Sequence, residues 1–463
     1  MQTKTSFLLC SIILLIKFFS IHYTNFDFFG DEAQYWVWSQ NLDLGYYSKP
    51  PLLSWLIATI TTIFGDSFET LKAIPITIYI FTSYLIFLVY KQLYHNTNEA
   101  ILAGLTFYLL PAVTVSSFLI STDILLIFFW SLSALFLLKI RERTTKINFI
   151  FLGVFLGLSF LSKYAAIYFF LSIMLVLFFD TKLRNIFFDN VAYVALSFFI
   201  IILILSPNII WNINNSWITL NHTMDNASLN RVNISFLRGL EFIGAQIIML
   251  GPILFFFFLF TIKKINASFE TRFLLTFSIP VFIIVLIESI LVRANANWAA
   301  VALVPFYIFC FHFVYQMSKK IIMANIFFNF LFGICFFYLI ATSSSLSPFN
   351  RINGVSFFAK NLNEHYLEKT NILVVTDRLL YSNLKYLLKS SKINMFTPHT
   401  PNTKIKNHFQ ITTPLLSSTK KNFLFLGSPN QIEYLDNQFS IKKLKSLKTK
   451  FNKEPIEIYE VFF

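Results

Sequence analysis

Charged residues are scarce in this chain. Asp, Glu, Lys and Arg make up 13% of its 463 residues, against about 25% in an ordinary globular protein. Disordered chains combine high charge with low hydrophobicity, so this composition excludes disorder. Cysteine is scarcer still, and Cys10, Cys310 and Cys335 all lie in apolar runs. The chain is therefore not a disulfide-stabilised scaffold, and no repeat of fixed period indicates a solenoid.

Hydrophobic residues take the place of the missing charge. They make up 56% of the chain, Phe alone fills 59 positions, and the mean hydropathy is +0.64. A soluble protein could not hide that much apolar surface. Since a membrane-spanning helix needs about 20 apolar residues, we expect a mainly α, polytopic membrane protein with about eleven spans. The predicted spans are 5–22, 71–90, 99–119, 121–139, 147–162, 164–180, 190–210, 240–262, 272–292, 298–317 and 321–342.

Two of these regions need a closer look: the interruption at Ser162-Lys163-Tyr164 and the first hydrophobic stretch. Ser162-Lys163-Tyr164 interrupts the fifth and sixth spans, which form either a tight hairpin or one long broken helix. The first hydrophobic stretch is followed by no small-x-small cleavage site, so we expect an uncleaved helix and no signal peptide.

The cations between the spans predict the orientation. With the N-terminus in the cytoplasm, the inner loops carry 13 Lys and Arg residues and the outer loops carry six. Cytoplasmic loops are normally enriched in Lys and Arg, so this asymmetry favours that orientation. An odd number of spans then places the C-terminal part in the periplasm. The six outer cations are Lys49, Lys72, Lys163, Arg231, Arg238 and Arg293.

The composition changes after about residue 345. This tail holds 17 Lys and Arg against eight Asp and Glu, so it supplies +9 of the net charge of +14. Short β-rich runs (NILVVTD, NFLFLG, IEIYEVFF) and the amphipathic stretch LLYSNLKYLLK predict a small α/β domain. We therefore predict a transmembrane domain at 1–343 and a periplasmic α/β domain at 344–463. The tail lacks a Gly-rich phosphate loop and a metal-spaced His/Cys set, which favours a structural or acceptor-docking role.

The outer loop at 23–70 has the densest set of candidate functional groups. Asp31 and Glu32 open an aromatic-rich stretch, and Lys49 precedes two prolines and an apolar segment at 52–64 that is too short to cross the membrane. A capped helix lying at the membrane surface would explain these residues without any chemistry. However, a carboxylate can act as general base on a hydroxyl, and Lys can neutralise a phosphate leaving group. The combination indicates an enzyme that meets a lipid-linked substrate at the interface.

Further polar residues fall on the same predicted face. Asp123 follows Ser121 and Thr122 at a helix start, where a simple cap is an equal alternative. Lys163 could merely extend its amine to the membrane surface. Arg293 could bind a phosphate bidentately or be an ordinary interfacial Arg. Amide and indole groups suit sugar hydroxyls and ring faces, and the residues of this kind are Trp211, Asn297 and Trp298.

Several motifs together resemble a family. FGDEAQYWVWSQNLDLGYYSKPPLLSWL is similar to the first periplasmic loop of bacterial GT-C-fold membrane glycosyltransferases, near the lipid A aminoarabinose transferases and the protein mannosyltransferases (the family 39-like enzymes). STDILLIFFW, GLSFLSKYAA, SPNIIWNINNSW and RANANWAAVALVP continue the likeness in order, over roughly residues 26 to 305. The tail matches nothing we can name.

The resemblance implies a mechanism and roles. The donor would be a sugar linked through phosphate to a polyprenol, typically undecaprenyl phosphate. The family's reactive Asp falls on Asp31, with Glu32 beside it, and its phosphate-binding lysines fall on Lys49 and Lys163. Tyr35, Tyr46 and Asp123 match residues that line the donor site.

Two departures separate the chain from the aminoarabinose transferases. Gln34 stands where they have Arg, and Ser48 stands where they have an acidic residue. The first change weakens the phosphate clamp, and the second leaves open whether a divalent metal ion takes part.

We therefore expect a glycosyltransferase of the bacterial inner membrane, acting on the periplasmic side on lipid A or another part of lipopolysaccharide. The alternatives are protein O-mannosylation and, in a different class, a transporter or flippase for lipid-linked sugar. Transporters place polar residues at the bilayer midplane on repeated, broken helices, whereas here the polar residues gather at one face. Membrane lipids are expected partners, and nucleic acid is not.

Overall fold

The computed structural model describes residues 2–226, 232–367, 370–401, 403–435 and 438–463. The chain forms two compact units. Unit 1 comprises Met1–Ile21, Lys49–Leu53 and Phe64–Tyr338, and unit 2 comprises His22–Ser48, Ser54–Ile63 and Leu339–Phe463. Most of the predicted outer loop thus belongs to the same unit as the C-terminal tail.

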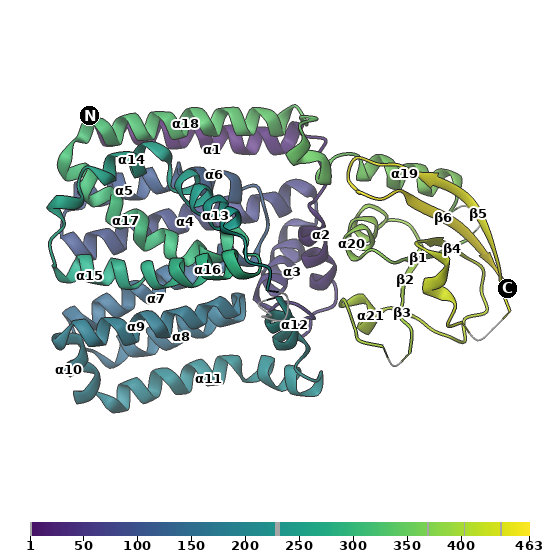
Figure 1. Ribbon diagram of the computed structural model, residues 1–463, viewed down its shortest axis with the longest axis horizontal. Helices are drawn as coiled ribbons and strands as arrows, with labels where there is room; N and C mark the ends of the chain where they lie inside the picture. Colours follow the sequence, from purple (N-terminus) through teal and green to yellow (C-terminus); the bar gives the residue numbers. More distant parts are fainter. Residues whose placement is uncertain (1, 227–231, 368–369, 402, 436–437) are drawn as a thin grey trace. The chain divides into compact units, whose positions relative to one another are not determined.

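Helices build unit 1 (Figure 1). Its α-helices are α1 (Gln2–Tyr23), α4 (Phe68–Tyr94), α5 (Thr97–Tyr108), α6 (Pro111–Ser116), α7 (Thr122–Glu142), α8 (Lys146–Ser162), α9 (Tyr168–Phe179), α10 (Thr181–Asp189), α11 (Val191–Asn214), α12 (Ile218–Asn226), α13 (Phe236–Leu250), α14 (Pro252–Leu259), α15 (Phe269–Thr276), α16 (Ile279–Leu291), α17 (Ala300–Met317) and α18 (Lys319–Ala341). The 3₁₀ turns are η1 (Tyr164–Ile167), η3 (Ile262–Lys264) and η4 (Ala296–Ala299).

The chain is a multi-span membrane protein. Within the described residues, seven helical segments are long and apolar enough to cross a bilayer, and two sharply bent pairs raise the number to nine. The shorter α8 coincides with the predicted span 147–162. Two other predicted spans are interrupted. The span 99–119 breaks between α5 and α6, and the span 240–262 bends by 102° between α13 and α14.

A helical hairpin settles the alternative left open at Ser162-Lys163-Tyr164. Arg141, near the end of α7, pairs with Asp180, which follows α9, at 2.9 Å. Asn148, in the first turn of α8, donates to the carbonyl of Arg143 at 2.9 Å. The start of α8 and the end of α9 therefore lie at the same end of unit 1, and the chain reverses direction at Lys163.

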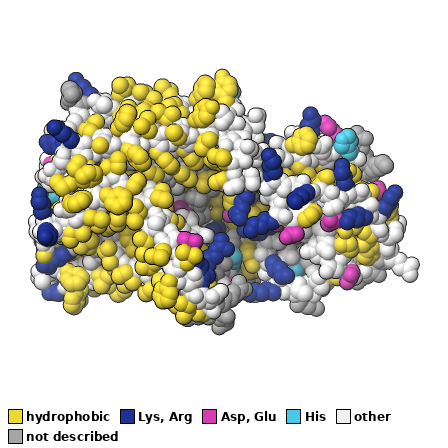
Figure 2. All heavy atoms as spheres, turned by 45° about the horizontal axis from the view of Figure 1, so that its top comes forward, with side chains coloured by type: hydrophobic (Ala, Val, Ile, Leu, Met, Phe, Trp, Pro, Cys, Tyr) yellow, Lys and Arg dark blue, Asp and Glu magenta, His cyan; other side chains and the backbone are white. Residues whose placement is uncertain are grey.

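The cations of unit 1 gather at the end marked by Arg141 and Asp180. Figure 2 shows Lys and Arg side chains at this end and a broad hydrophobic surface beside them. One predicted outer cation behaves differently. Lys72 lies inside α4, fully buried, and donates to the carbonyl of Phe118 at 2.9 Å. The sequence analysis counted Lys72 with the outer loops, whereas the helix begins at Phe68 and includes it. Arg231 lies outside the described residues.

Unit 2 contains a six-stranded sheet with strand order β3-β2-β1-β4-β6-β5 (Figure 1). The strands β1, β2, β3 and β4 are parallel, and β6 pairs antiparallel with β4 and β5. The runs predicted as strands are β1, β4 and β6, and the amphipathic stretch is α20. The strands are β1 (Ile372–Val375), β2 (Asn394–Pro398), β3 (Pro414–Leu415), β4 (Phe423–Leu426), β5 (Ser440–Leu447) and β6 (Ile456–Phe462). The helical elements are α2 (Gly30–Ser39), α3 (Leu52–Phe64, shared with unit 1), η5 (Ser347–Ile352), α19 (Val355–His365), α20 (Arg378–Leu387), α21 (Phe409–Thr412) and η6 (Pro429–Ile432).

Hydrophobic packing forms the core of unit 2. Leu373 and Val375 of β1 and Leu384 of α20 are completely buried in a cluster that also includes Ile458 of β6. The burial of alternate β1 residues on both faces explains its continuous apolar run, as expected for a central parallel strand.

Asp27 connects the outer loop to the C-terminal part of unit 2. Its carboxylate accepts the backbone N–H of Val355 at 2.7 Å and that of Ser356 at 3.1 Å, in the first turn of α19. The backbone N–H of Asp27 donates to the carbonyl of Ile352 at 2.8 Å. Burial raises the pKa of Asp27, although these N–H groups act in the opposite direction. The loop is thus held by a helix cap supplied from 328 positions away.

Candidate active site

A polar cluster lies at the end of unit 1 opposite the cations. Lys163 Nζ donates to Asp123 Oδ1 at 2.6 Å, and Asn297 Nδ2 donates to Asp123 Oδ2 at 2.7 Å. The side chains of Lys163 and Asp123 are 16% and 10% exposed. Three residues that the sequence singled out separately therefore form one hydrogen-bonded group, which we call the Asp123 cluster.

Local breaks in the helices position the three side chains. Asp123 lies in the first turn of α7, after the N-cap Ser121, which makes no side-chain cap bond. Lys163 has extended backbone between α8 and η1, and Asn297 lies in η4 before α17. Because both carboxylate oxygens of Asp123 bind side chains of other segments, the simple cap does not account for this residue.

A cavity of about 440 Å³ adjoins the Asp123 cluster. Asp123 and Asn297 lie in its wall, and the other lining side chains are mostly apolar, from Tyr79 of α4 to Phe332 of α18. Apolar pockets with a few convergent polar groups are typical of binding sites for small molecules and lipids. This cavity can accept a hydrocarbon chain whose polar end reaches the cluster.

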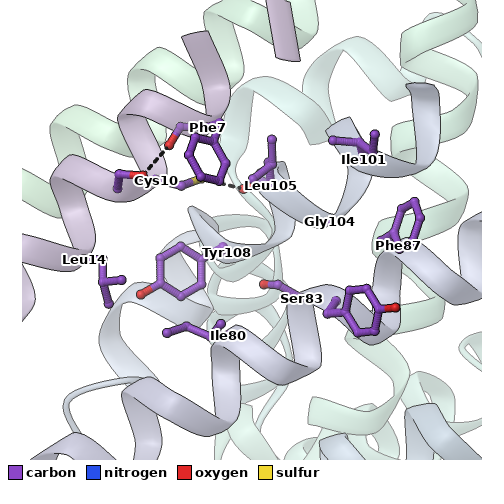
Figure 3. A pocket seen from close by; sticks show the side chains of 12 residues that line it. Phe7, Cys10, Leu14, Ile80, Ser83, Phe87, Ile101, Gly104, Leu105 and Tyr108 are labelled. Atoms are coloured by element: carbon purple, nitrogen blue, oxygen red, sulfur yellow. Dashed lines mark hydrogen bonds between the residues drawn. The ribbon is translucent and has the colours of Figure 1, made fainter. Parts of the chain in front are cut away.

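A second cavity of about 520 Å³ has a different character (Figure 3). Its wall consists of Phe7, Cys10 and Leu14 of α1 together with residues of α4 and α5. Its accessible wall is almost entirely apolar, although Ser83 and Tyr108 are among the lining residues, and no charged side chain of the described residues lines it.

The remaining predicted residues of unit 1 lie in varied surroundings. Arg293 is exposed, Trp298 is half-buried, and Trp211 is buried in α11. Beside Trp211, Asn212 donates to the hydroxyl of Tyr164 at 3.2 Å. Lys49 is half-buried, and the structure groups it with unit 1 and not with Asp31.

The two adjacent carboxylates of unit 2 differ in accessibility. The Asp31 side chain is 41% exposed. Glu32 is 2% exposed, and its Oε2 accepts the backbone N–H of Phe29 at 2.8 Å, which satisfies a donor at the start of α2. Of the pair, Asp31 is the carboxylate that a substrate can reach without disturbing the helix.

Asp31 has a basic partner from the C-terminal part of the chain. Arg378 Nη1 donates to Asp31 Oδ1 at 2.9 Å and to Gln34 Oε1 at 2.7 Å. This contact could not be predicted from local sequence patterns, because the partners lie 347 positions apart. The one available signal was the place of Arg378 after a predicted buried strand, where parallel sheets often bind ligands.

Tyr35 and Tyr46 belong to an aromatic cluster in unit 2. Tyr46 is fully buried and stacks on Trp38 with ring centroids 4.6 Å apart, and Tyr35 contacts Trp38 edge-on at 5.6 Å. The Tyr46 hydroxyl donates to the carbonyl of Trp38 at 3.1 Å. Burial raises the pKa of Tyr46 to about 12.

His408 also packs against Trp38 and Tyr46, and the sequence analysis did not identify it. Burial lowers the pKa of His408 to about 4, although the nearby Asp43 acts in the opposite direction. Its ring is therefore neutral at pH 7.

The structure offers limited support for a metal ion. Among the described residues, no three His, Cys, Asp or Glu side chains gather in a group that could hold one.

Comparisons with known proteins bear on this geometry. The profile of the family described as dolichyl-phosphate-mannose-protein mannosyltransferase matches residues 48–211. Lipid A galacturonosyltransferase RgtD of Rhizobium johnstonii (strain DSM 114642 / LMG 32736 / 3841) is 31% identical over 308 residues, which cover 66% of this chain and 64% of RgtD. The resemblance to the GT-C membrane glycosyltransferases is confirmed. The match spans slightly less than two thirds of the length of RgtD.

Solved structures extend the likeness to the whole fold. The structures of ArnT from Cupriavidus metallidurans, in the apo state and bound to undecaprenyl phosphate, each match with a TM-score of 0.70 at 12% identity. These matches cover 99% of this chain and 98% of ArnT. The apo oligosaccharyltransferase of Archaeoglobus fulgidus matches with a TM-score of 0.52 at 14% identity, covering 95% of this chain and 69% of that one. The predicted GT-C-like fold with a small C-terminal sheet is thereby confirmed.

Proposed function

We propose that this protein is an integral-membrane glycosyltransferase. It moves a sugar from a polyprenyl-phosphate donor to lipid A or another part of lipopolysaccharide. The observation that carries the proposal is the Asp123 cluster beside a largely apolar cavity. A lipid-linked sugar phosphate needs both parts, since its chain requires hydrocarbon surroundings and its phosphate requires a cation. The names of RgtD and of the ArnT structure with undecaprenyl phosphate support the same assignment.

The proposed reaction inverts the anomeric carbon. The acceptor oxygen forms a bond to this carbon while the bond to the phosphate oxygen breaks, and polyprenyl phosphate leaves. Lys163 stabilises the charge that develops on the departing phosphate, and Lys49 is proposed to share this role. Asp123, itself held by Asn297, accepts one N–H of the Lys163 amine, and among the described residues no other acceptor takes the remaining two, which are proposed to bind the phosphate.

Asp31 keeps the role that the resemblance implies. It takes the proton of an acceptor hydroxyl, or orients the acceptor where the acceptor is an already ionised phosphate. Glu32 is proposed to assist Asp31 by accepting the N–H of Phe29 and so holding the start of α2 in place. Arg293 is a further proposed phosphate ligand, and Trp211 and Trp298 are proposed to line the donor site. Tyr35 and Tyr46, which the resemblance assigned to the donor site, are buried in the aromatic cluster of unit 2.

The proposal places the protein in the bacterial inner membrane. The cation-rich end of unit 1 faces the cytoplasm, in agreement with the positive-inside rule. The N-terminus is then cytoplasmic, and the Asp123 cluster and the C-terminal domain face the periplasm.

A transfer assay with the purified full-length protein tests the assignment. Galacturonic acid linked to polyprenyl phosphate is the first donor to try, given the name of RgtD, with lipid A as acceptor. We expect release of polyprenyl phosphate, a roughly 100- to 1,000-fold loss in kcat for Lys163→Met, and a roughly 100- to 10,000-fold loss for Asp31→Asn. Lys320→Gln, which removes an exposed lysine at the opposite end of unit 1, serves as the control.

The same assay separates the alternatives. A lipid-linked-sugar flippase would move the donor without releasing polyprenyl phosphate. A protein O-mannosyltransferase would require a mannosyl donor and would label a peptide but not lipid A. Wild-type turnover by both Lys163→Met and Asp31→Asn, at matched folding, would refute the roles. Mass spectrometry of lipid A, core oligosaccharide and glycoproteins from a deletion strain would then identify the sugar and the acceptor.

A further inference from the structure

The first turns of α2 and α20 lie unusually close together within unit 2. A Cβ placed on Gly30 would come within 2.4 Å of the Leu379 Cβ, so only glycine permits this approach. Farther along the same helices, the ring of Trp36 packs on that of Tyr386 with centroids 4.9 Å apart. This packing brings Arg378 onto Asp31 and Gln34, and it fixes the contact through backbone and rings as well as through the ion pair.

The sheet topology also distinguishes the position of Arg378. From β1 the chain proceeds to β2 and β3 on one side, whereas β4 lies on the other side of β1. Open parallel sheets bind ligands where the strand order reverses in this way, outside the carboxyl ends of the strands. Arg378 begins α20 three residues after the end of β1, and the intervening Thr376 donates its N–H to Leu426 at the end of β4.

Stability does not explain the Asp31–Arg378 pair. Its side chains are 41% and 39% exposed, and ion pairs at this degree of exposure contribute little to folding. Within the described chain, only Nη1 of Arg378 binds protein side chains. The guanidinium therefore keeps its Nε and Nη2 donors for another anion, while Asp31 and Gln34 fix its plane.

We propose that Arg378 completes the Asp31 site by binding a phosphate group of a substrate through Nε and Nη2 while Nη1 holds the Asp31 carboxylate in position. A planar guanidinium with two parallel N–H donors suits a phosphate, which it binds bidentately. The α/β part of unit 2 is then a working part of the enzyme and not only a structural or docking domain. This inference rests on the proposed function.

Kinetics of full-length variants tests the role of Arg378. We expect Arg378→Gln to lower kcat/KM by roughly 30- to 100-fold, and Arg378→Lys, which keeps the charge but loses the fork, by about tenfold. Lys360→Gln is the matched control, because Lys360 is an exposed cation of α19 whose partner Glu364 is 3.9 Å away. It should retain wild-type kinetics.

A charge-relocating variant separates a role in the site from a role in folding. Gln34 shares Nη1 of Arg378 with Asp31, so an arginine at position 34 would place a guanidinium beside the same carboxylate. We expect kcat/KM of the double variant Gln34→Arg/Arg378→Gln to be at least tenfold higher than that of Arg378→Gln. Recovery would not follow if Arg378 acted only by joining α2 to α20.

Two measurements, inhibition by undecaprenyl phosphate and the KM for the acceptor, identify which phosphate Arg378 binds. If it binds the donor phosphate, Arg378→Gln weakens inhibition by undecaprenyl phosphate about tenfold or more and leaves the KM for acceptor unchanged. If it binds an acceptor phosphate, the KM for lipid A rises while the KM for dephosphorylated lipid A does not change.

The inference and the proposed function fail in different ways. An active wild type with an inactive Asp31→Asn variant and a fully active Arg378→Gln variant would overturn the inference alone. The inference alone is also overturned if Arg378→Gln changes neither the inhibition by undecaprenyl phosphate nor the KM for lipid A. A wild type that releases no polyprenyl phosphate from any donor would overturn the proposed function first.

Discussion

Two carboxylate–cation pairs of this protein, Asp123–Lys163 and Asp31–Arg378, differ in how deeply they are buried. Asp123 and Lys163 in unit 1 are 2.6 Å apart and almost buried, and Asn297 satisfies the second carboxylate oxygen. Asp31 and Arg378 in unit 2 are 2.9 Å apart and about 40% exposed, with donors of the Arg left over. Breaking a buried pair leaves an uncompensated charge, whereas an exposed pair can change partners at little cost.

Because of this difference in burial, we expect the two ion pairs to respond differently to a bound substrate. The hydrogen bonds of the Asp123 cluster fix the Lys163 amine in advance, so under the proposed function the amine is already oriented when the donor phosphate binds. The Asp31–Arg378 pair can instead share its charge with a substrate, because water already competes for both partners.

The largest effect is expected where the buried pair is broken. Lys163→Met should lower the free energy of unfolding by about 3 kcal/mol, since the nearly buried Asp123 carboxyl would lose its cation. The double variant Asp123→Asn/Lys163→Met should recover most of this loss without recovering activity. Thermal and denaturant unfolding in detergent, followed by tryptophan fluorescence, measures both. Equal stability losses in the single and double variants would contradict the assignment of a coupled pair.

The next effect concerns pH and the aromatic cluster of unit 2. The pKa of His408 is about 4 in the folded protein and about 6.5 when unfolded. The unfolded chain therefore binds more protons between these values, and stability falls as the pH drops below 6.5. Between pH 7.5 and pH 5, the titration of His408 should lower the free energy of unfolding by about 2 kcal/mol.

Unfolding of His408→Gln across the same pH range measures this contribution. The variant should lose about 2 kcal/mol of the pH dependence, whereas the exposed His365→Gln should keep the wild-type slope. A His408→Gln curve parallel to the wild type would show that the pKa of the imidazole is the same in the folded and the unfolded protein.

A smaller effect is expected at the contact between the outer loop and α19. Asp27→Ala removes the acceptor for two N–H groups at the start of this helix and should cost about 1 to 2 kcal/mol. Glu364→Ala, in the exposed pair with Lys360, should cost less than about 0.5 kcal/mol. Limited proteolysis of the loop adds a local readout, and wild-type protection in Asp27→Ala would contradict its capping role.

The membrane architecture was predictable because each span is a local property of the sequence. Hydropathy located the helices and charge asymmetry indicated their ends, but continuous apolar runs concealed the breaks. The run 240–262 contains Gly251, which adopts a positive φ of 96°, followed by Pro252 at the start of α14. Gly-Pro is a recognised breaker signal, so this bend could have been anticipated from the sequence.

The site was only partly predictable, because some of its contacts join residues that are far apart in the sequence. Asp31, Asp123, Lys163 and Asn297 were recognisable because charge and amide groups stand out in a chain so poor in them. The pairing of Asp31 with Arg378 depends instead on Gly30 meeting Leu379 and on the order of strands in a sheet. No periodicity in the sequence encodes such distant contacts, which is why the tail was predicted to have a structural or acceptor-docking role.

The smallest expected change in stability belongs to the exposed pair. Asp31→Asn should alter the free energy of unfolding by less than about 1 kcal/mol, because Arg378 remains hydrated and keeps Gln34 as a partner. The same unfolding assay as for Lys163→Met applies, with Asn in place of Asp preserving the side-chain shape. A loss as large as that of Lys163→Met would mean that the Asp31–Arg378 pair is architectural after all. A small loss combined with failed transfer would instead mean that Asp31 is retained for the reaction, since it contributes almost nothing to folding.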